Sequence, residues 1–156
     1  VQATALERRA STLVEGVSLF HLQQGSADEA HALVDRALEL RTRVGSREAF
    51  LQAITDARSG LADRDMYVFA LNDSGTYLAF AGNPAKVGTR VHDIPGVDGQ
   101  RLIDSIVAQA DQGAGWVEYD IVNPKSGQVQ PKMSYVQRCE GVIVGCGVYK
   151  NLLAVA

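Results

Sequence analysis

Apolar residues in the first third of the chain recur every three or four positions, which predicts amphipathic helices. This spacing covers residues 4–24, about 27–44 and about 47–58. Gly25-Ser26 and Gly45-Ser46 separate the three segments, and each pair combines a glycine that ends one helix with a serine that caps the next. The chain is therefore predicted to be entirely helical up to the end of the third segment.

The period of the pattern changes at residue 65, where aromatic and β-branched residues indicate strands. Residues 65–71 and 76–81 are predicted to form a hairpin around a loop at 72–75. Regular pairing around this loop gives three opposed pairs, which are Leu71 with Thr76, Phe69 with Leu78, and Tyr67 with Phe80. The hairpin would then present one aromatic and aliphatic face, which either a helix or a ligand covers.

Residues 82–99 lack periodicity and are rich in glycine and proline, so they predict a long loop, and loops of that length are usually functional. A fourth amphipathic helix is expected over 99–112. Two strand-like runs follow within 115–136, and a final strand over 141–152. Consecutive strands with tight turns predict an antiparallel sheet with helices segregated to one side, which is a single α+β domain.

Composition narrows the classes of function. The 156 residues are 46% hydrophobic and 21% charged, which fits one globular domain. The net charge of −3 and the lack of a dense Lys/Arg cluster argue against a nucleic-acid partner. No apolar run in the sequence approaches the about 20 residues of a membrane span. Cys139 and Cys146 lack metal-ligand spacing, so we predict two small buried thiols and no metal or cofactor site.

The candidate chemistry is concentrated in residues 115–136, two strand-like runs joined by a turn. They carry Trp116, Tyr119 and Tyr135, and Lys132 stands among these aromatic residues. One interpretation is a hairpin with core aromatics and a solvated lysine, and on the residues alone this comes first. The other is a grip for a small carboxylate, because an ammonium and phenol hydroxyls are hydrogen-bond donors.

A second candidate is the pair His92-Asp93 within the long loop. A histidine beside an aspartate can serve as an acid–base pair, but no serine or cysteine stands in a recognisable nucleophile motif. We therefore do not expect an enzyme.

Several short motifs in order resemble the single Cache domain, the extracytoplasmic sensor module of bacterial chemoreceptors and sensor kinases. The resemblance covers essentially the whole chain. It is carried by residues 65–81, Asn83-Pro84-Ala85-Lys86-Val87-Gly88, Asp98-Gly99, Gly115-Trp116-Val117-Glu118-Tyr119, Asn123-Pro124, Gly127, Pro131-Lys132-Met133-Ser134-Tyr135-Val136 and Gly145-Cys146-Gly147-Val148-Tyr149.

This resemblance implies an α+β fold with a PAS-like five-stranded antiparallel sheet, a long N-terminal helix and further helices. Residues 1–156 would form one sensor domain, helical over about 1–58, with the sheet portion over about 62–152. The family binds small organic acids such as acetate, propionate, pyruvate or lactate, and its long helix commonly pairs in a homodimer. Such a domain normally lies between two membrane spans, in the periplasm, and signals across the membrane, often in chemotaxis.

With the resemblance added, Lys132 and Tyr135 become expected ligand contacts, and the expected pocket walls are Tyr67, Phe69, Trp116 and Tyr119. Strand parity conflicts with this set, since Lys132 and Tyr135 point to opposite faces of a regular strand. A bulge, or a strand that begins after Lys132, would resolve the conflict.

One position departs from the family. Many relatives carry His-Pro after the second strand, where this chain has Phe80-Ala81, so the pocket is expected to be more apolar at that corner. The alternative to a sensor is a PAS-like regulatory or dimerisation module without a small ligand.

Overall fold

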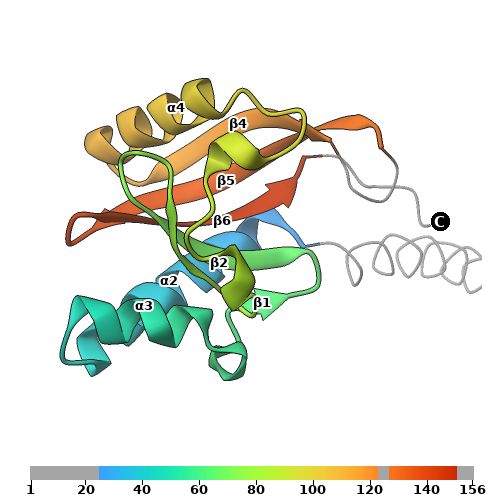
Figure 1. Cartoon of the computed structure of the whole chain (residues 1–156). Coiled ribbons are helices and arrows are strands. Elements are labelled where there is room, and N and C mark those ends of the chain that lie inside the picture. The colour runs from blue at the N-terminus through green and yellow to red at the C-terminus, as the bar shows by residue number, and fades with distance from the viewer. Residues whose placement is uncertain (1–24, 123–126, 151–156) are drawn as a thin grey trace, which may run out of the picture.

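The computed structural model describes residues 25–122 and 127–150 (Figure 1). The helix predicted over 4–24 lies outside these residues. The helices are α2 (Ala27–Arg43), α3 (Arg47–Thr55) and α4 (Gly99–Gln112), with 3-10 turns η1 (Ala57–Ser59), η2 (Pro84–Lys86) and η3 (Val91–Asp93). The strands are β1 (Ala62–Asp63), β2 (Met66–Leu71), β3 (Tyr77–Phe80), β4 (Gly115–Val122), β5 (Val129–Cys139) and β6 (Val142–Tyr149). No helix among the described residues is both long enough and apolar enough to cross a membrane.

The predicted serine caps open both α2 and α3. The Ser26 hydroxyl accepts a hydrogen bond from the backbone N–H of Glu29 (3.3 Å) and donates one to its carboxylate (3.0 Å). The Ser46 hydroxyl accepts from the backbone N–H of Ala49 at 3.1 Å. Helix α3 is shorter than predicted, because it ends at Thr55 and the chain continues in the 3-10 turn η1.

The strands form an antiparallel sheet in the order β1-β2-β6-β5-β4, with β3 also paired to β2. All five predicted strands are present, and the two-residue β1 is an addition that the sequence pattern did not indicate. The last strand of the chain, β6, lies in the middle of the sheet, and its residues from Val142 to Val148 are buried. This is the α+β, PAS-like arrangement expected from the sequence.

The predicted register of the first hairpin is wrong. Leu71 pairs with Tyr77 and Phe69 pairs with Phe80, because the pairing of β2 with β3 shifts between Ala70 and Leu71. A shift of one residue sends side chains to the other face of a sheet. Tyr77 therefore joins the side of the sheet that carries Phe69, and Leu78 packs on the opposite side.

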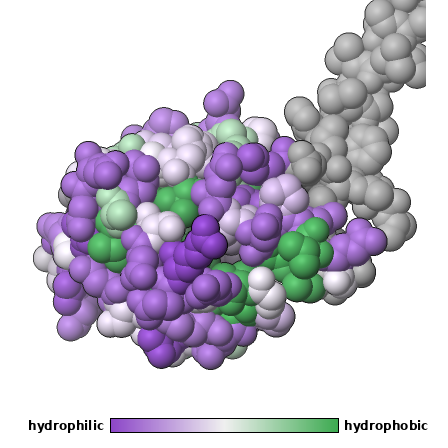
Figure 2. Space-filling view, turned by 90° about the horizontal axis from the view of Figure 1, so that it is seen from above, coloured by the Kyte–Doolittle hydropathy of each residue, from purple (hydrophilic) through white to green (hydrophobic). Residues whose placement is uncertain are grey.

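Helices cover both faces of the sheet, so the expectation that they segregate to one side is also wrong (Figure 1). Helices α2 and α3 pack on one face, and α4 packs on the other with the loop that precedes it. Helix α4 buries Leu102, Ile103 and Ile106 and turns polar residues outward. The surface seen from the α4 side is accordingly mostly hydrophilic (Figure 2).

The long loop of residues 82–98 is fastened to β3 and to α4. Tyr77 exchanges backbone hydrogen bonds of 2.8 Å with Gly88 and Thr89. At the other end, the Asp98 carboxylate accepts from the backbone N–H of Arg101 and caps α4. The loop is thus anchored over this side of the sheet, and its own Val91 is buried there.

The contact between η3 and the start of α4 requires a glycine. A Cβ at Gly99 would lie 2.4 Å from the Cα and 2.7 Å from the backbone nitrogen of His92. Because backbone atoms cannot move aside cheaply, we expect Gly99→Ala to lower the free energy of unfolding by about 1–3 kcal/mol. Gly45→Ala is the matched control, since a Cβ there meets no atom within 4 Å, and it should shift stability by at most about 1 kcal/mol. Chemical denaturation measures both, and equal stabilities would contradict the packing of η3 on α4.

Candidate ligand-binding site

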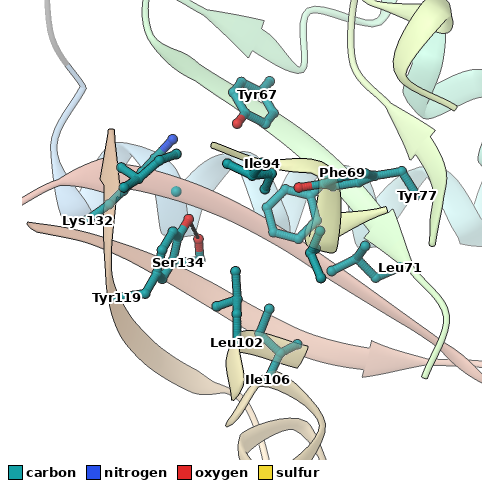
Figure 3. Close-up of a pocket in the computed structure, with 13 residues that line it drawn as sticks. Tyr67, Phe69, Leu71, Tyr77, Ile94, Leu102, Ile106, Tyr119, Lys132 and Ser134 are labelled. Carbon is teal, nitrogen blue, oxygen red and sulfur yellow. Dashed lines mark hydrogen bonds between the residues drawn. The ribbon is translucent and has the colours of Figure 1, made fainter. Parts of the chain in front are cut away.

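A small cavity lies between the sheet and the layer formed by η3 and α4 (Figure 3). Its volume is about 20 Å³, which is room for about one water molecule. Strands β2, β3, β4, β5 and β6 supply the floor, and η3, the residues after it and α4 supply the roof. The polar side chains on its wall are Tyr67, Tyr77, Tyr119, Lys132 and Ser134; the other lining residues are Phe69, Leu71, Val91, Ile94, Leu102, Ile106, Ile121 and Gly147.

Lys132 is the charged group of the cavity, and its side chain is only 4% exposed. Its ammonium lies 5.2 Å from the ring centre of Tyr67 and 5.1 Å from that of Tyr149, both favourable cation–π distances. Within the described part of the chain, it contacts no carboxylate and makes no hydrogen bond. Gly147 makes room for the lysine stem, because a Cβ there would lie 3.0 Å from Lys132 Cε.

The tyrosines of the cavity are held as neutral phenols. The hydroxyls of Tyr119 and Ser134 share a hydrogen bond of 3.0 Å. Burial raises the pKa of Tyr119, although nearby Lys132 acts in the opposite direction. Burial also raises the pKa of Tyr67 to about 12 and raises the pKa of Tyr77. All three hydroxyls are therefore able to donate hydrogen bonds throughout the neutral pH range.

The site combines one positive charge, the Lys132 ammonium, with neutral hydroxyl donors and an apolar wall. A buried ammonium is costly unless an anion pairs with it, and cation–π contacts offset only part of that cost. The apolar wall, with Leu102 and Ile106 from α4, suits a short carbon chain. The arrangement is chemically suited to hold a small organic anion.

The structure places four of the six residues predicted for the site on the cavity wall: Lys132, Tyr67, Phe69 and Tyr119. It places the other two, Trp116 and Tyr135, on the opposite face of the sheet. There the Tyr135 ring lies 4.2 Å from the ring of His31 in α2 and 5.3 Å from that of Trp116.

Strand parity separates these two groups. Strand β5 begins at Val129 and pairs regularly with β4, placing Lys132 opposite Tyr119 and Tyr135 opposite Trp116. The suggestion that a bulge, or a strand beginning after Lys132, would bring both pairs into one pocket is therefore wrong. Trp116 and Tyr135 instead pack toward α2.

Sequence reasoning did not name the other nine lining residues, among them Tyr77, Ser134 and Gly147. Ser134 follows Lys132 by two positions, so strand parity alone places it on the same face. Gly147 stands opposite Ser134 in the pairing of β5 with β6. Tyr77 was hidden by the wrong hairpin register, which assigned that face to Leu78 instead.

Phe80, the residue at which we expected an apolar corner of the pocket, is 8% exposed. Its ring stacks on that of Tyr67, with centres 4.3 Å apart and planes at 22°. Phe80 packs behind Tyr67 and does not line the cavity, so the expected apolar corner is not part of the cavity wall.

His92 and Asp93 do not form an acid–base pair in this structure. The Asp93 carboxylate accepts a hydrogen bond from the backbone N–H of Arg90 at 3.1 Å. The Nε2 atom of His92 lies 3.3 Å from the side-chain oxygen of Gln100. Both residues have local roles at the start of the α4 layer, and neither lines the cavity.

Comparison with known proteins agrees with this fold. The sequence matches the family described as Single Cache domain 2 over residues 23–153. It is also similar to the sensor histidine kinase MctS of Rhizobium johnstonii, with 28% identity over 88 residues. That match covers 55% of this chain and 19% of the kinase, so the chain spans a small part of the curated relative.

Solved structures with the same fold include sensor domains of chemotaxis proteins. A methyl-accepting chemotaxis protein from Vibrio parahaemolyticus aligns with a TM-score of 0.58 and 18% identity, over 93% of this chain and 96% of that one. A periplasmic sensor domain of a chemotaxis protein gives 0.54 and 24%, over 91% and 97%. A Cache chemosensory domain solved to explain carboxylic acid recognition gives 0.52 and 21%, over 97% and 99%. Because the family match over residues 23–153 covers most of the chain, the chain belongs to the Single Cache domain 2 family.

Proposed function

We propose that this domain is a sensor that binds a small organic acid, a carboxylate of two to four carbons, and signals across the membrane. The observation that carries the proposal is the buried Lys132 ammonium, which faces the cavity without a carboxylate partner among the described residues. A ligand carboxylate would supply the missing charge, and the hydroxyls of Tyr119 and Ser134 would complete its hydrogen bonds. The role is binding, without catalysis.

The size of the cavity bears on how such a ligand would act. A space of about 20 Å³ does not hold even a two-carbon acid, so binding requires the α4 layer and the sheet to move apart. A ligand shifts a conformational equilibrium only if it binds the two states differently. An acid that fits only the expanded state satisfies this condition, which supports a signalling role.

An extracytoplasmic location goes with membership of the family, and sensor domains of chemotaxis proteins and a sensor kinase are among the relatives. We propose that the domain belongs to a membrane receptor, with chemotaxis as the favoured output. We also retain the proposal that a homodimer forms through the N-terminal helix. That helix lies outside the described residues.

The rival proposal is a PAS-like regulatory or dimerisation module without a small ligand. The small volume of the cavity is the observation that favours it. In the first proposal Lys132 binds the carboxylate of a ligand, and in the second it binds no ligand. The two can be separated by experiment.

Thermal unfolding with acetate, propionate, pyruvate, lactate and butyrate tests the ligand. At a concentration 100 times its Kd, a bound acid stabilises by about 2.7 kcal/mol, which is a rise in Tm of about 5–10 °C for a domain of this size. We expect Lys132→Met to weaken binding at least about 30-fold, since it removes one partner of a buried charge pair.

Lys150→Met is the control for this experiment. Lys150 pairs with Glu118 at 3.0 Å and does not line the cavity, so the variant should bind acids like the wild type. If no acid raises the Tm, or if Lys132→Met responds fully, the organic-acid proposal fails and the ligand-free module is favoured.

The stability of the protein without ligand gives a second prediction. If Lys132 exists to meet an anion, its burial costs stability, and an apolar side chain of similar length should relieve that cost. We expect Lys132→Met to leave the free energy of unfolding unchanged or to raise it by about 1–3 kcal/mol, as measured by urea denaturation. A loss of more than about 1 kcal/mol would instead assign the lysine a role in holding the fold.

A further inference from the structure

Two tyrosine hydroxyls in the cavity have no hydrogen-bond partner among the described residues. They belong to Tyr67 on β2 and Tyr77 on β3, both of which line the cavity. Figure 3 shows the two hydroxyls turned toward the interior of the pocket, on the side away from the Tyr119–Ser134 pair. Both hydroxyls are open to the cavity, and a tyrosine hydroxyl inside a protein usually finds a partner, so a molecule in the cavity is the partner they can meet.

Packing alone accounts for the rings but not for the hydroxyls. Tyr77 is 7% exposed, and its ring makes edge contacts with Phe69 (5.8 Å) and Phe80 (5.3 Å). The Tyr67 ring stacks on Phe80 and lies beside the Lys132 ammonium. A phenylalanine would make the same ring contacts at either position, so the hydroxyls are an extra polar feature of the site.

The charges on the cavity wall limit what the hydroxyls can meet. Of the 13 described residues that line it, Lys132 alone carries a formal charge. The lysine is satisfied by one carboxylate. A second carboxylate would be buried against neutral phenols without a cation, which is costly. A well-matched ligand therefore has one carboxylate, and any further oxygen that it carries outside that group is uncharged.

We propose that the site selects short monocarboxylic acids that carry a second, neutral oxygen, a hydroxyl or keto group, over plain alkanoates and over dicarboxylates. This inference rests on the proposed function, because it takes the carboxylate to lie at Lys132. The second oxygen accepts a hydrogen bond from Tyr77 or Tyr67. The apolar wall of α4 encloses the carbon atoms between the two polar ends.

Titration of the phenols does not disturb this arrangement. Burial raises the pKa of Tyr67 to about 12 and also raises that of Tyr77, so both hydroxyls keep their protons near neutral pH. A protonated phenol donates to a keto oxygen and can donate to or accept from a hydroxyl. A methyl or methylene group at the same place forms no comparable hydrogen bond with the phenol.

Isothermal titration of the wild-type domain with five four-carbon acids tests the selection. The acids are butyrate, 2-hydroxybutyrate, 3-hydroxybutyrate, 2-oxobutyrate and succinate, which differ in the second oxygen at a constant number of carbons. We expect at least one of the three hydroxy or keto acids to bind about 3- to 10-fold more tightly than butyrate, the gain from one neutral hydrogen bond. Succinate should bind more weakly than that acid.

Tyr77→Phe and Tyr67→Phe keep the rings and remove one hydroxyl each. We expect at least one of these variants to bind the preferred acid with the affinity of butyrate, while its affinity for butyrate stays within about 2-fold of wild type. Tyr135→Phe is the matched control, because Tyr135 lies on the opposite face of the sheet, and it should keep the full preference.

The outcomes separate this inference from the proposed function. If none of the acids binds, the organic-acid proposal fails and this inference fails with it. If acids bind through Lys132 but butyrate or succinate binds as tightly as all three hydroxy and keto acids, only the selection is overturned. It is also overturned if the preference persists in the Tyr67→Phe/Tyr77→Phe double variant.

Discussion

The regular pairing of β4, β5 and β6 is the constraint on which the site depends. Alternation along β5 sends Lys132 and Ser134 toward α4, and it sends Tyr135 toward α2. A slip of one residue would exchange these sets, burying a lysine under α2 and opening the cavity to a tyrosine. The aromatic pair Trp116 and Tyr135 therefore serves the site from the other face, because its packing against α2 resists such a slip.

The roof of the cavity is held differently at its two ends. Near the end of α4, Arg138 of β5 contacts both Asp111 (2.9 Å) and Asp73 of the first hairpin (3.0 Å). Above β4, the roof meets the sheet through close apolar contact, with Gly96 so near Val122 that a Cβ would lie 2.2 Å from its side chain. Among the described residues, ion pairs at one end and apolar contact at the other hold the layer to β4 and β5, while its backbone hydrogen bonds run to Gly75 and Tyr77 of the first hairpin. That is the kind of boundary at which two packed layers can separate without breaking a strand.

The sequence was sufficient wherever a local rule decided the outcome. Serine caps set the starts of α2 and α3, and helical spacing set α4 to the residue. Prediction from the sequence failed where pairing between strands set the structure. The shift in the pairing of β2 with β3, between Ala70 and Leu71, places Tyr77 on the face of the site. The expected single helical layer was wrong for a similar reason, since nothing local tells an amphipathic helix which face of a sheet it will cover. For the candidate site, the alternation of side chains along a strand already indicated that Lys132 and Tyr135 could not both line one pocket. The pairing of β5 with β4 then showed that Lys132 is the one on the side of the site.

The cavity has its depth because the central strand β6 carries glycines, which have no side chain, on the side of the site. On the side of the site, β6 presents Gly145 and Gly147, and larger side chains from its neighbours lie across them. A Cβ at Gly145 would lie 2.7 Å from the ring of Phe69, and one at Gly147 would lie 2.7 Å from the Ser134 hydroxyl. Glycine usually weakens a strand, and here β6 is the most buried strand of the sheet, where neighbours on both sides hold it in place. The fold thus places glycine where neighbouring strands support the backbone best, and the space gained admits the Lys132 stem, whose ammonium lies near the rings of Tyr67 and Tyr149.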